Sequence, residues 1–189
     1  MSLFLIRTML WLASMVLLAV IAATDLRDRI IPNEAVILIA ISGFALSLVT
    51  RPGSVWVSLL ASVVLLGALW TLVYRDVLGG GDAKLIAAVT LIVPPDRIGL
   101  LLLEIALAGG VLSVAYFAAY CVLRRAPVSQ CIAVNAACPT SGFNRFLRSE
   151  RARIITGQSV PYALAALGGV CIYVVNECYR CLFATSCSL

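Results

Sequence analysis

The sequence contains no histidine, and only 12% of its 189 residues carry a charge. Without an imidazole, the chain can form neither a Ser-His-Asp triad nor a zinc site that depends on histidine ligands. Any acid–base chemistry must therefore come from carboxylates, lysine, tyrosine or cysteine. Hydrophobic residues make up 62% of the chain and its mean hydropathy is +1.07, both far above the values of soluble domains. This composition predicts an integral membrane protein.

Cysteine motifs that bind metals are also scarce. Of the seven cysteines, only Cys178 and Cys181 have CxxC spacing, and a zinc site would need a second such pair. We therefore expect no metal and no cofactor, and we interpret most cysteines as free thiols in apolar surroundings. One disulfide among Cys178, Cys181 and Cys187 remains open. The net charge of +5 is spread over the chain, so that membrane topology explains it better than a nucleic-acid partner does.

Apolar runs separated by charged, proline-rich or glycine-rich segments predict an all-α, polytopic protein with about six transmembrane helices, forming one membrane-embedded domain over residues 1–189. The expected helices cover residues 3–23, 34–49, 55–74, 83–93, 98–123 and 160–183. The fourth is short, because its 11 residues rise only about 17 Å, roughly half of the hydrocarbon thickness. Either the bilayer is thin at this place, or the glycines before the helix enter the protein interior.

The basic residues are distributed unevenly between the two sides that alternating helices would create. The loops at residues 24–33, 74–84 and 124–159 hold ten of the fourteen lysines and arginines, six of them in the basic loop 124–159. Because positive loops stay in the cytoplasm, these loops are predicted to be cytoplasmic and both termini to lie outside. Asp25 and Asp82 then share the cytoplasmic face.

Asp82 directly follows three glycines and opens a short apolar segment. A carboxylate at membrane depth is energetically costly, which marks it as a candidate functional group, and glycines allow a second peptide to approach closely. A simpler interpretation is that Asp82 is the N-cap of a helix beginning at Ala83, with the glycines forming only a turn. The presence of a second carboxylate, Asp25, on the same face favours the functional interpretation.

Two carboxylates at one level can share a proton, one acting as base toward water while the other polarises a carbonyl group. We expect Asp82, at a helix N-terminus, to be the base, and Asp25, at a helix C-terminus, to be the acid. Exchanging the two roles would leave the reaction unaltered. Asp28 could replace Asp25, but its neighbours Arg27 and Arg29 favour a solvated cluster of ion pairs.

These residues resemble a known family. Gly79-x-Gly81-Asp82, followed by Ala83-Lys84-Leu85, resembles the GxGD motif of intramembrane aspartic proteases, in particular of the type IV prepilin peptidases. Asp25, with Ile31-Pro32-Asn33 behind it, matches the family's first catalytic aspartate. Residues 160–165 are similar to the start of its last helix. The resemblance covers roughly residues 10–170, and the two motifs together are far more specific than either alone.

The resemblance implies an aspartic endopeptidase of the bacterial inner membrane, with Asp25 and Asp82 as catalytic residues. It would cleave the leader peptide of prepilin-like or pseudopilin-like substrates at the cytoplasmic face, beside the substrate's hydrophobic helix. The motif residues expected to support the substrate cleft are Gly79, Gly81, Lys84, Pro32 and Asn33. Larger members carry an N-terminal extension with two CxxC pairs linked to N-methylation. The chain lacks that extension, so we expect no methyltransferase activity and a similarity to the short branch that serves Flp, or tight-adherence, pili.

Two other classes of function remain open. A small proton-coupled carrier could use Asp25 and Asp82 as relay groups, although no internal repeat supports a transporter. The second alternative is a non-catalytic subunit of a pilus or secretion assembly. The presence of both motifs argues against this alternative. Lys84 could hold the charge of Asp82 or steer the substrate, or it could extend toward lipid headgroups. The oligomeric state is not predicted.

Overall fold

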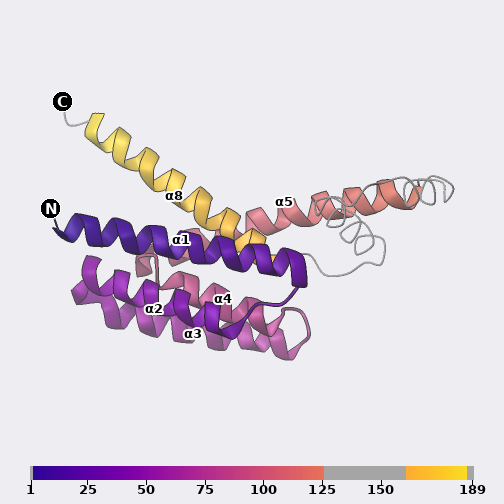
Figure 1. Cartoon of the computed structure of the whole chain (residues 1–189), viewed down its shortest axis with the longest axis horizontal. Coiled ribbons are helices and arrows are strands. Elements are labelled where there is room, and N and C mark those ends of the chain that lie inside the picture. The colour runs from indigo at the N-terminus through magenta and orange to yellow at the C-terminus, as the bar shows by residue number, and fades with distance from the viewer. Residues whose placement is uncertain (1, 126–160, 187–189) are drawn as a thin grey trace, which may run out of the picture. The chain divides into compact units, whose positions relative to one another are not determined.

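The computed structural model describes residues 2–125 and 161–186, and in these ranges the chain is helical with no β-strand. The described part contains six α-helices, and two 3-10 turns, η1 (Pro52–Ser54) and η2 (Pro95–Arg97), join some of them. Figure 1 shows how these helices follow one another along the chain. The helices are α1 (Ser2–Asp28), α2 (Asn33–Thr50), α3 (Val55–Tyr74), α4 (Gly80–Thr90), α5 (Ile98–Arg125) and α8 (Tyr162–Ser186). The predicted all-α fold with a short fourth helix is confirmed. The predicted basic loop lies outside the described residues, except for residues 124 and 125, which end α5.

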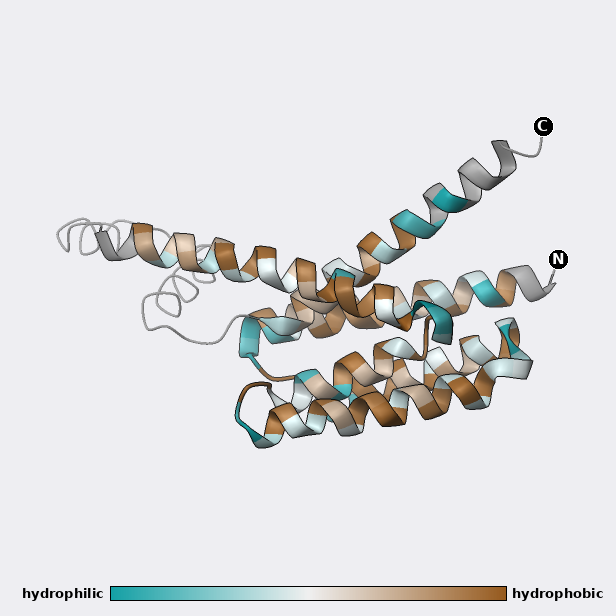
Figure 2. Cartoon of the chain, turned by 180° about the vertical axis from the view of Figure 1, so that it is seen from behind, coloured by the Kyte–Doolittle hydropathy of each residue, from teal (hydrophilic) through white to brown (hydrophobic). Residues whose placement is uncertain are grey.

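Four stretches are long and apolar enough to cross a bilayer: Leu5–Asp28, Asn33–Thr50, Pro52–Tyr74 and Pro95–Val122. The outer surface of α3 shows why they need lipid around them. Trp56, Leu60 and Val64 lie one helical turn apart and are 62–76% exposed, a stripe that water would disfavour. Figure 2 shows that hydrophobic residues recur along the length of the helices. The protein is therefore a polytopic membrane protein.

The chain divides into two compact units, Met1–Gly109 with Pro161–Leu189, and Gly110–Val160. The first unit contains the predicted site residues and all the interactions described below. Within it, α4 contacts α2, α3 and α8, and seven of its eleven residues are buried. Hydroxyl groups link neighbouring helices: Ser62 donates to the carbonyl of Ala87 at 2.6 Å, and Ser14 donates to Ser42 at 3.1 Å. In an apolar surrounding such bonds and small residues hold helices together.

The segment containing α4 reaches both ends of α2 although α4 is short. Near its start, Lys84 Nζ donates to Asn33 Oδ1 at 3.1 Å, at the first residue of α2. Just after its end, the carbonyl of Ile92 accepts from Arg51 Nη2 at 3.3 Å, directly after α2. Residues 84 to 92 rise about 12 Å, whereas the 18 residues of α2 rise about 27 Å. The long side chains of Lys84 and Arg51 therefore bridge the distance by which α2 exceeds the α4 segment.

Two helix boundaries differ from the prediction in ways that affect the site. The first helix was expected to end at residue 23, but α1 continues to Asp28, so that Asp25 lies inside its last turn. The fourth was expected to begin at Ala83, but α4 begins at Gly80. The third helix, residues 55–74, has the predicted bounds.

Candidate active site

Asp25 is buried, with 6% of its surface exposed, and its carboxylate lies against the start of α8. The backbone N–H of Ala163, the second residue of α8, donates to Asp25 Oδ2 at 3.0 Å. The first N–H groups of a helix have no partner within the helix, and the positive end of the helix dipole favours a negative charge there. The last turn of α1 thus presents Asp25 as an anionic cap to α8.

Asp82 occupies the first turn of α4, whose N-cap is Gly79. The interpretation of Asp82 as the N-cap itself is therefore wrong. Its carboxylate turns back and accepts a hydrogen bond from the backbone N–H of Gly79, as the acidic residue of a capping box does. This return is why the helix begins earlier than expected. A Cβ atom on Gly79 would lie 2.7 Å from Asp82 Oδ2, whereas on Gly80 it would meet nothing closer than 3.9 Å.

The connection between α1 and α2 passes directly over the start of α4. A Cβ atom on Gly81 would lie 3.3 Å from Ile31 Cβ, so the two backbones approach closely at this point. Pro32 is the N-cap residue of α2, and the next residue, Asn33, accepts the hydrogen bond from Lys84. Lys84 therefore contacts Asn33, and this hydrogen bond joins the Gly-rich motif around Asp82 to the Ile-Pro-Asn segment that follows Asp25.

Asp82 lies outside the four stretches that could span a bilayer, is half-buried, and has a pKa raised from 3.8 to about 6. Burial is the main cause, the charge of Asp25 raises the pKa further, and the hydrogen bond from Gly79 lowers it. Burial also raises the pKa of Tyr162, at the start of α8, and the charge of Asp82 adds to this shift. The structure therefore brings Asp25, Asp82 and Tyr162 within electrostatic reach of one another.

Asp28, the alternative to Asp25, lies in different surroundings. Its carboxylate is 3.8 Å from Arg27 Nε, and both side chains are more than half exposed. The expected ion pair in solvent is confirmed, and such exposed pairs contribute little to stability. Asp28 thus offers a matched control for Asp25 on the same helix.

The last helix was expected to start at residue 160, and Tyr162 was open to two interpretations, a residue bordering the substrate cleft or a tyrosine at the membrane interface. Nothing in the sequence places this helix against Asp25, which precedes Ala163 by 138 residues. Proline before an apolar run was the available signal, and it indicates a helix start without indicating its neighbour. Among the described residues, no three Cys, Asp or Glu side chains gather in a way that could hold a metal ion.

Comparison with known proteins identifies one family model that matches the chain. The model, described as the type IV leader peptidase family, matches residues 12–114, just over half of the 189 residues. The matched range contains both Asp25 and Asp82, as well as Pro32, Asn33 and Lys84. No match to the chain is found among the curated proteins, and none among the solved structures.

Proposed function

The chain belongs to the type IV leader peptidase family and is thus a membrane peptidase, and we propose that it hydrolyses its substrate with an aspartic dyad formed by Asp25 and Asp82. The observation that carries this proposal is the electrostatic coupling of the two carboxylates. They come from different helices, yet the charge of Asp25 raises the pKa of Asp82. Carboxylates close enough to interact in this way favour a state in which one is ionised and the other protonated.

The surroundings of the two side chains support an assignment opposite to the one expected from the sequence. Asp25 accepts a hydrogen bond from the backbone N–H of Ala163, at the positive end of the α8 dipole. Asp82 has a raised pKa, which favours its protonated form. We therefore assign the base to Asp25 and the acid to Asp82, and exchanging the two roles would leave the reaction unaltered.

The proposed reaction follows from these roles. Asp25 takes a proton from water as the water oxygen bonds to the carbonyl carbon of the scissile peptide, and Asp82 donates its proton to the carbonyl oxygen. In the second step the C–N bond breaks, the proton on Asp25 passes to the leaving amine, and Asp82 recovers a proton from the hydroxyl group. Both residues return to their starting states, so the dyad is ready for the next substrate.

The substrate we propose is a prepilin-like or pseudopilin-like protein with a leader peptide, cut at the cytoplasmic face of the bacterial inner membrane. Family membership supports the substrate class. The predicted cytoplasmic position of Asp25 and Asp82 supports cleavage on the cytoplasmic side of the membrane. The finer assignment, a small prepilin of a Flp or tight-adherence pilus, rests on the resemblance of the two motifs.

The test is co-expression with a tagged small prepilin, followed by its mobility shift on cleavage. Asp25→Asn and Asp82→Asn should each reduce the cleavage rate by at least about 100-fold, because each removes one partner of the proton exchange. Asparagine keeps an oxygen that can accept the hydrogen bond of Ala163 or Gly79, so that the fold is preserved. Asp28→Asn, on the same helix as Asp25 but exposed, should cleave at the rate of the unmodified protein.

Cleavage at the unmodified rate by either dyad variant would contradict the mechanism. Absence of any cleaved product together with pH-dependent flux in proteoliposomes would instead indicate a carrier. Pilus assembly that needs the protein but tolerates both asparagine variants would indicate a non-catalytic subunit.

A further inference from the structure

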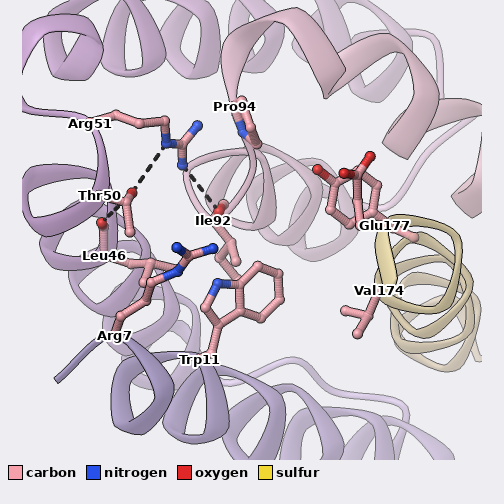
Figure 3. Close-up of a pocket in the computed structure, with 10 residues that line it drawn as sticks. Arg7, Trp11, Leu46, Thr50, Arg51, Ile92, Pro94, Val174 and Glu177 are labelled. Atoms are coloured by element: carbon pink, nitrogen blue, oxygen red, sulfur yellow. Dashed lines mark hydrogen bonds between the residues drawn. The ribbon is translucent and has the colours of Figure 1, made fainter. Parts of the chain in front are cut away.

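A cavity of about 760 Å³ lies far from the dyad, where α1 begins and α2 ends. Its lining includes Arg7 and Trp11 of α1, Arg51 after α2, and Glu177 of α8. Arg7 precedes Asp25 by 18 residues on the same helix, a separation of about 27 Å. Figure 3 shows the guanidinium groups of Arg7 and Arg51 turning into this cavity beside the ring of Trp11. The cavity is thus a separate site with two cationic side chains.

Arg51 is held in place but incompletely satisfied. Its Nε donates to Thr50 Oγ1 at 3.2 Å and its Nη2 donates to the carbonyl of Ile92, while its Nη1 is buried without a hydrogen-bond partner. Burial lowers the pKa of Arg51, and the charge of Arg7 lowers it further, although Tyr173 and Asp96 act in the opposite direction. The two arginines therefore repel each other across a space in which one N–H group has nothing to bind.

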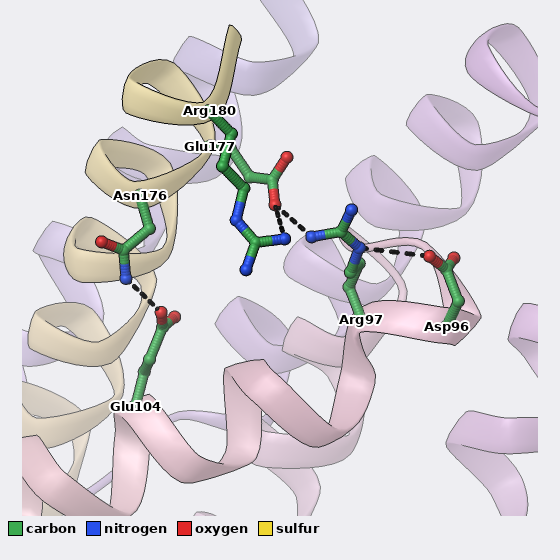
Figure 4. Close-up of polar contacts among 6 residues, drawn as sticks. All are labelled: Asp96, Arg97, Glu104, Asn176, Glu177 and Arg180. Carbon is green, nitrogen blue, oxygen red and sulfur yellow. Dashed lines mark hydrogen bonds and ion pairs between the residues drawn. The ribbon is translucent and has the colours of Figure 1, made fainter. Parts of the chain in front are cut away.

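The carboxylates near the cavity already form ion pairs with two other arginines. Glu177 Oε1 lies 2.8 Å from Arg97 Nη1 and 4.0 Å from Arg180 Nη1, and Asp96 lies 3.2 Å from Arg97 Nε. Figure 4 shows this group of ion pairs. In the part of the chain that the structure describes, neither Arg7 nor Arg51 forms an ion pair with a carboxylate. An anion from outside the chain would supply the missing partner.

The remaining wall of the cavity is mostly apolar, apart from Thr50 and Tyr173. Leu46, Ile92, Pro94 and Val174 contribute to its walls. On α1, the exposed side chains around Arg7 and Trp11 are hydrophobic, namely Leu5, Met9 and Leu12. Trp11 follows Arg7 by one helical turn, the arrangement that places an indole at the level of the headgroups with a cation beside it. A ligand that fits must combine an anionic head with hydrocarbon.

We propose that this cavity binds an anionic phospholipid, whose phosphate lies between Arg7 and Arg51 and whose acyl chain covers the apolar wall. Guanidinium groups bind phosphate through paired N–H donors, and phosphate oxygens would satisfy the buried Nη1 of Arg51. Basic pockets between transmembrane helices bind lipid headgroups on the cytoplasmic side of membranes, and the same chemistry would act here at the opposite face. The proposal does not depend on the peptidase mechanism, because the cavity shares no residue with the dyad.

The test uses the full chain purified in an uncharged detergent, with thermal unfolding as the readout. Added dioleoyl phosphatidylglycerol should raise the melting temperature by roughly 5–10 °C at about 100 times its dissociation constant. Dioleoyl phosphatidylcholine, which has the same chains but no net charge, should produce little change. Arg7→Gln and Arg51→Gln should each weaken phosphatidylglycerol binding about tenfold or more. Arg75→Gln, which removes the same charge at an exposed position outside the cavity, should bind normally.

Each alternative result has a definite meaning. If Arg51→Gln fails to fold, Arg7→Gln decides the question, since Arg7 is exposed. Unchanged phosphatidylglycerol binding in Arg7→Gln, or an equal effect of phosphatidylcholine, would overturn the proposal. An equal stabilisation by glycerol phosphate, the soluble headgroup alone, would show a simple anion site and overturn the assignment to a lipid.

Discussion

Asp25 and Asp82 carry the same side chain, but their hydrogen-bond donors come from different parts of the chain. The donor to Asp25 is the start of a distant helix, whereas the donor to Asp82 is the N-cap of its own helix. The hydrogen bond from Ala163 to Asp25 joins α8 to α1, whereas the hydrogen bond from Gly79 to Asp82 lies within the first turn of α4. Two identical groups can acquire different protonation states in this way, which is what a base and an acid require.

Asp82→Asn should stabilise the protein at neutral and alkaline pH while abolishing cleavage. The pKa of Asp82 rises from 3.8 to about 6 on folding, so the folded state holds this proton more tightly than the unfolded state does. The resulting stabilisation is complete below pH 3.8 and is lost as the pH rises to about 6. Asparagine cannot ionise and avoids this loss. We expect a melting temperature about 2–4 °C above that of the unmodified protein at pH 8, and no gain at pH 4.

Asp28→Asn provides the control for this measurement, because Asp28 is exposed and paired with Arg27. Its melting temperature should follow that of the unmodified protein at both pH values. A loss of stability in Asp82→Asn that is equal at pH 4 and pH 8 would mean that the carboxylate serves only as a helix cap.

At the scale of elements, the start of α4 decides where the second carboxylate points. Gly79→Ala would place a methyl group 2.7 Å from Asp82 Oδ2 and displace the carboxylate, whereas Gly80→Ala adds a methyl group in ordinary contact with Val73. We expect Gly79→Ala to reduce prepilin cleavage by about tenfold or more, and Gly80→Ala to leave it nearly unchanged. The mobility shift of the substrate measures both. Equal activity of the two variants would show that the position of Asp82 does not depend on Gly79.

The same helices show what the sequence could predict. The bounds of α3 follow from Pro52-Gly53 before it and Arg75-Asp76 after it, which are local stop signals. The start of α4 was missed because a run of glycines predicts a turn, and the local capping bond from Gly79 to Asp82 lacks the Ser or Thr at the N-cap that would indicate it in the sequence. The close approach of α8 to Asp25 was beyond prediction for a different reason: no local pattern reports a contact between residues so far apart in the chain.

At the scale of the whole molecule, the distribution of basic residues predicts the orientation in the membrane. Lys84 and Arg51 tie the α4 segment to opposite ends of α2, which is consistent with a crossing by this short helix. Tags at both termini should therefore be digested by protease added outside spheroplasts, and a tag inserted within residues 124–159 should be protected until the membrane is lysed. The reverse pattern would place Asp25 and Asp82 on the outer face and contradict cleavage in the cytoplasm.

The contact between Ala163 and Asp25 can form only late in synthesis. A ribosome adds about 5–20 residues per second, so roughly 7–28 s separate the synthesis of Asp25 from that of Ala163, 138 residues later. Throughout that interval the nascent chain contains Asp25 but not the N–H group that donates to it in the folded protein. The surroundings of the proposed dyad are therefore completed only after α8 has been synthesised, and we expect no cleavage before that point.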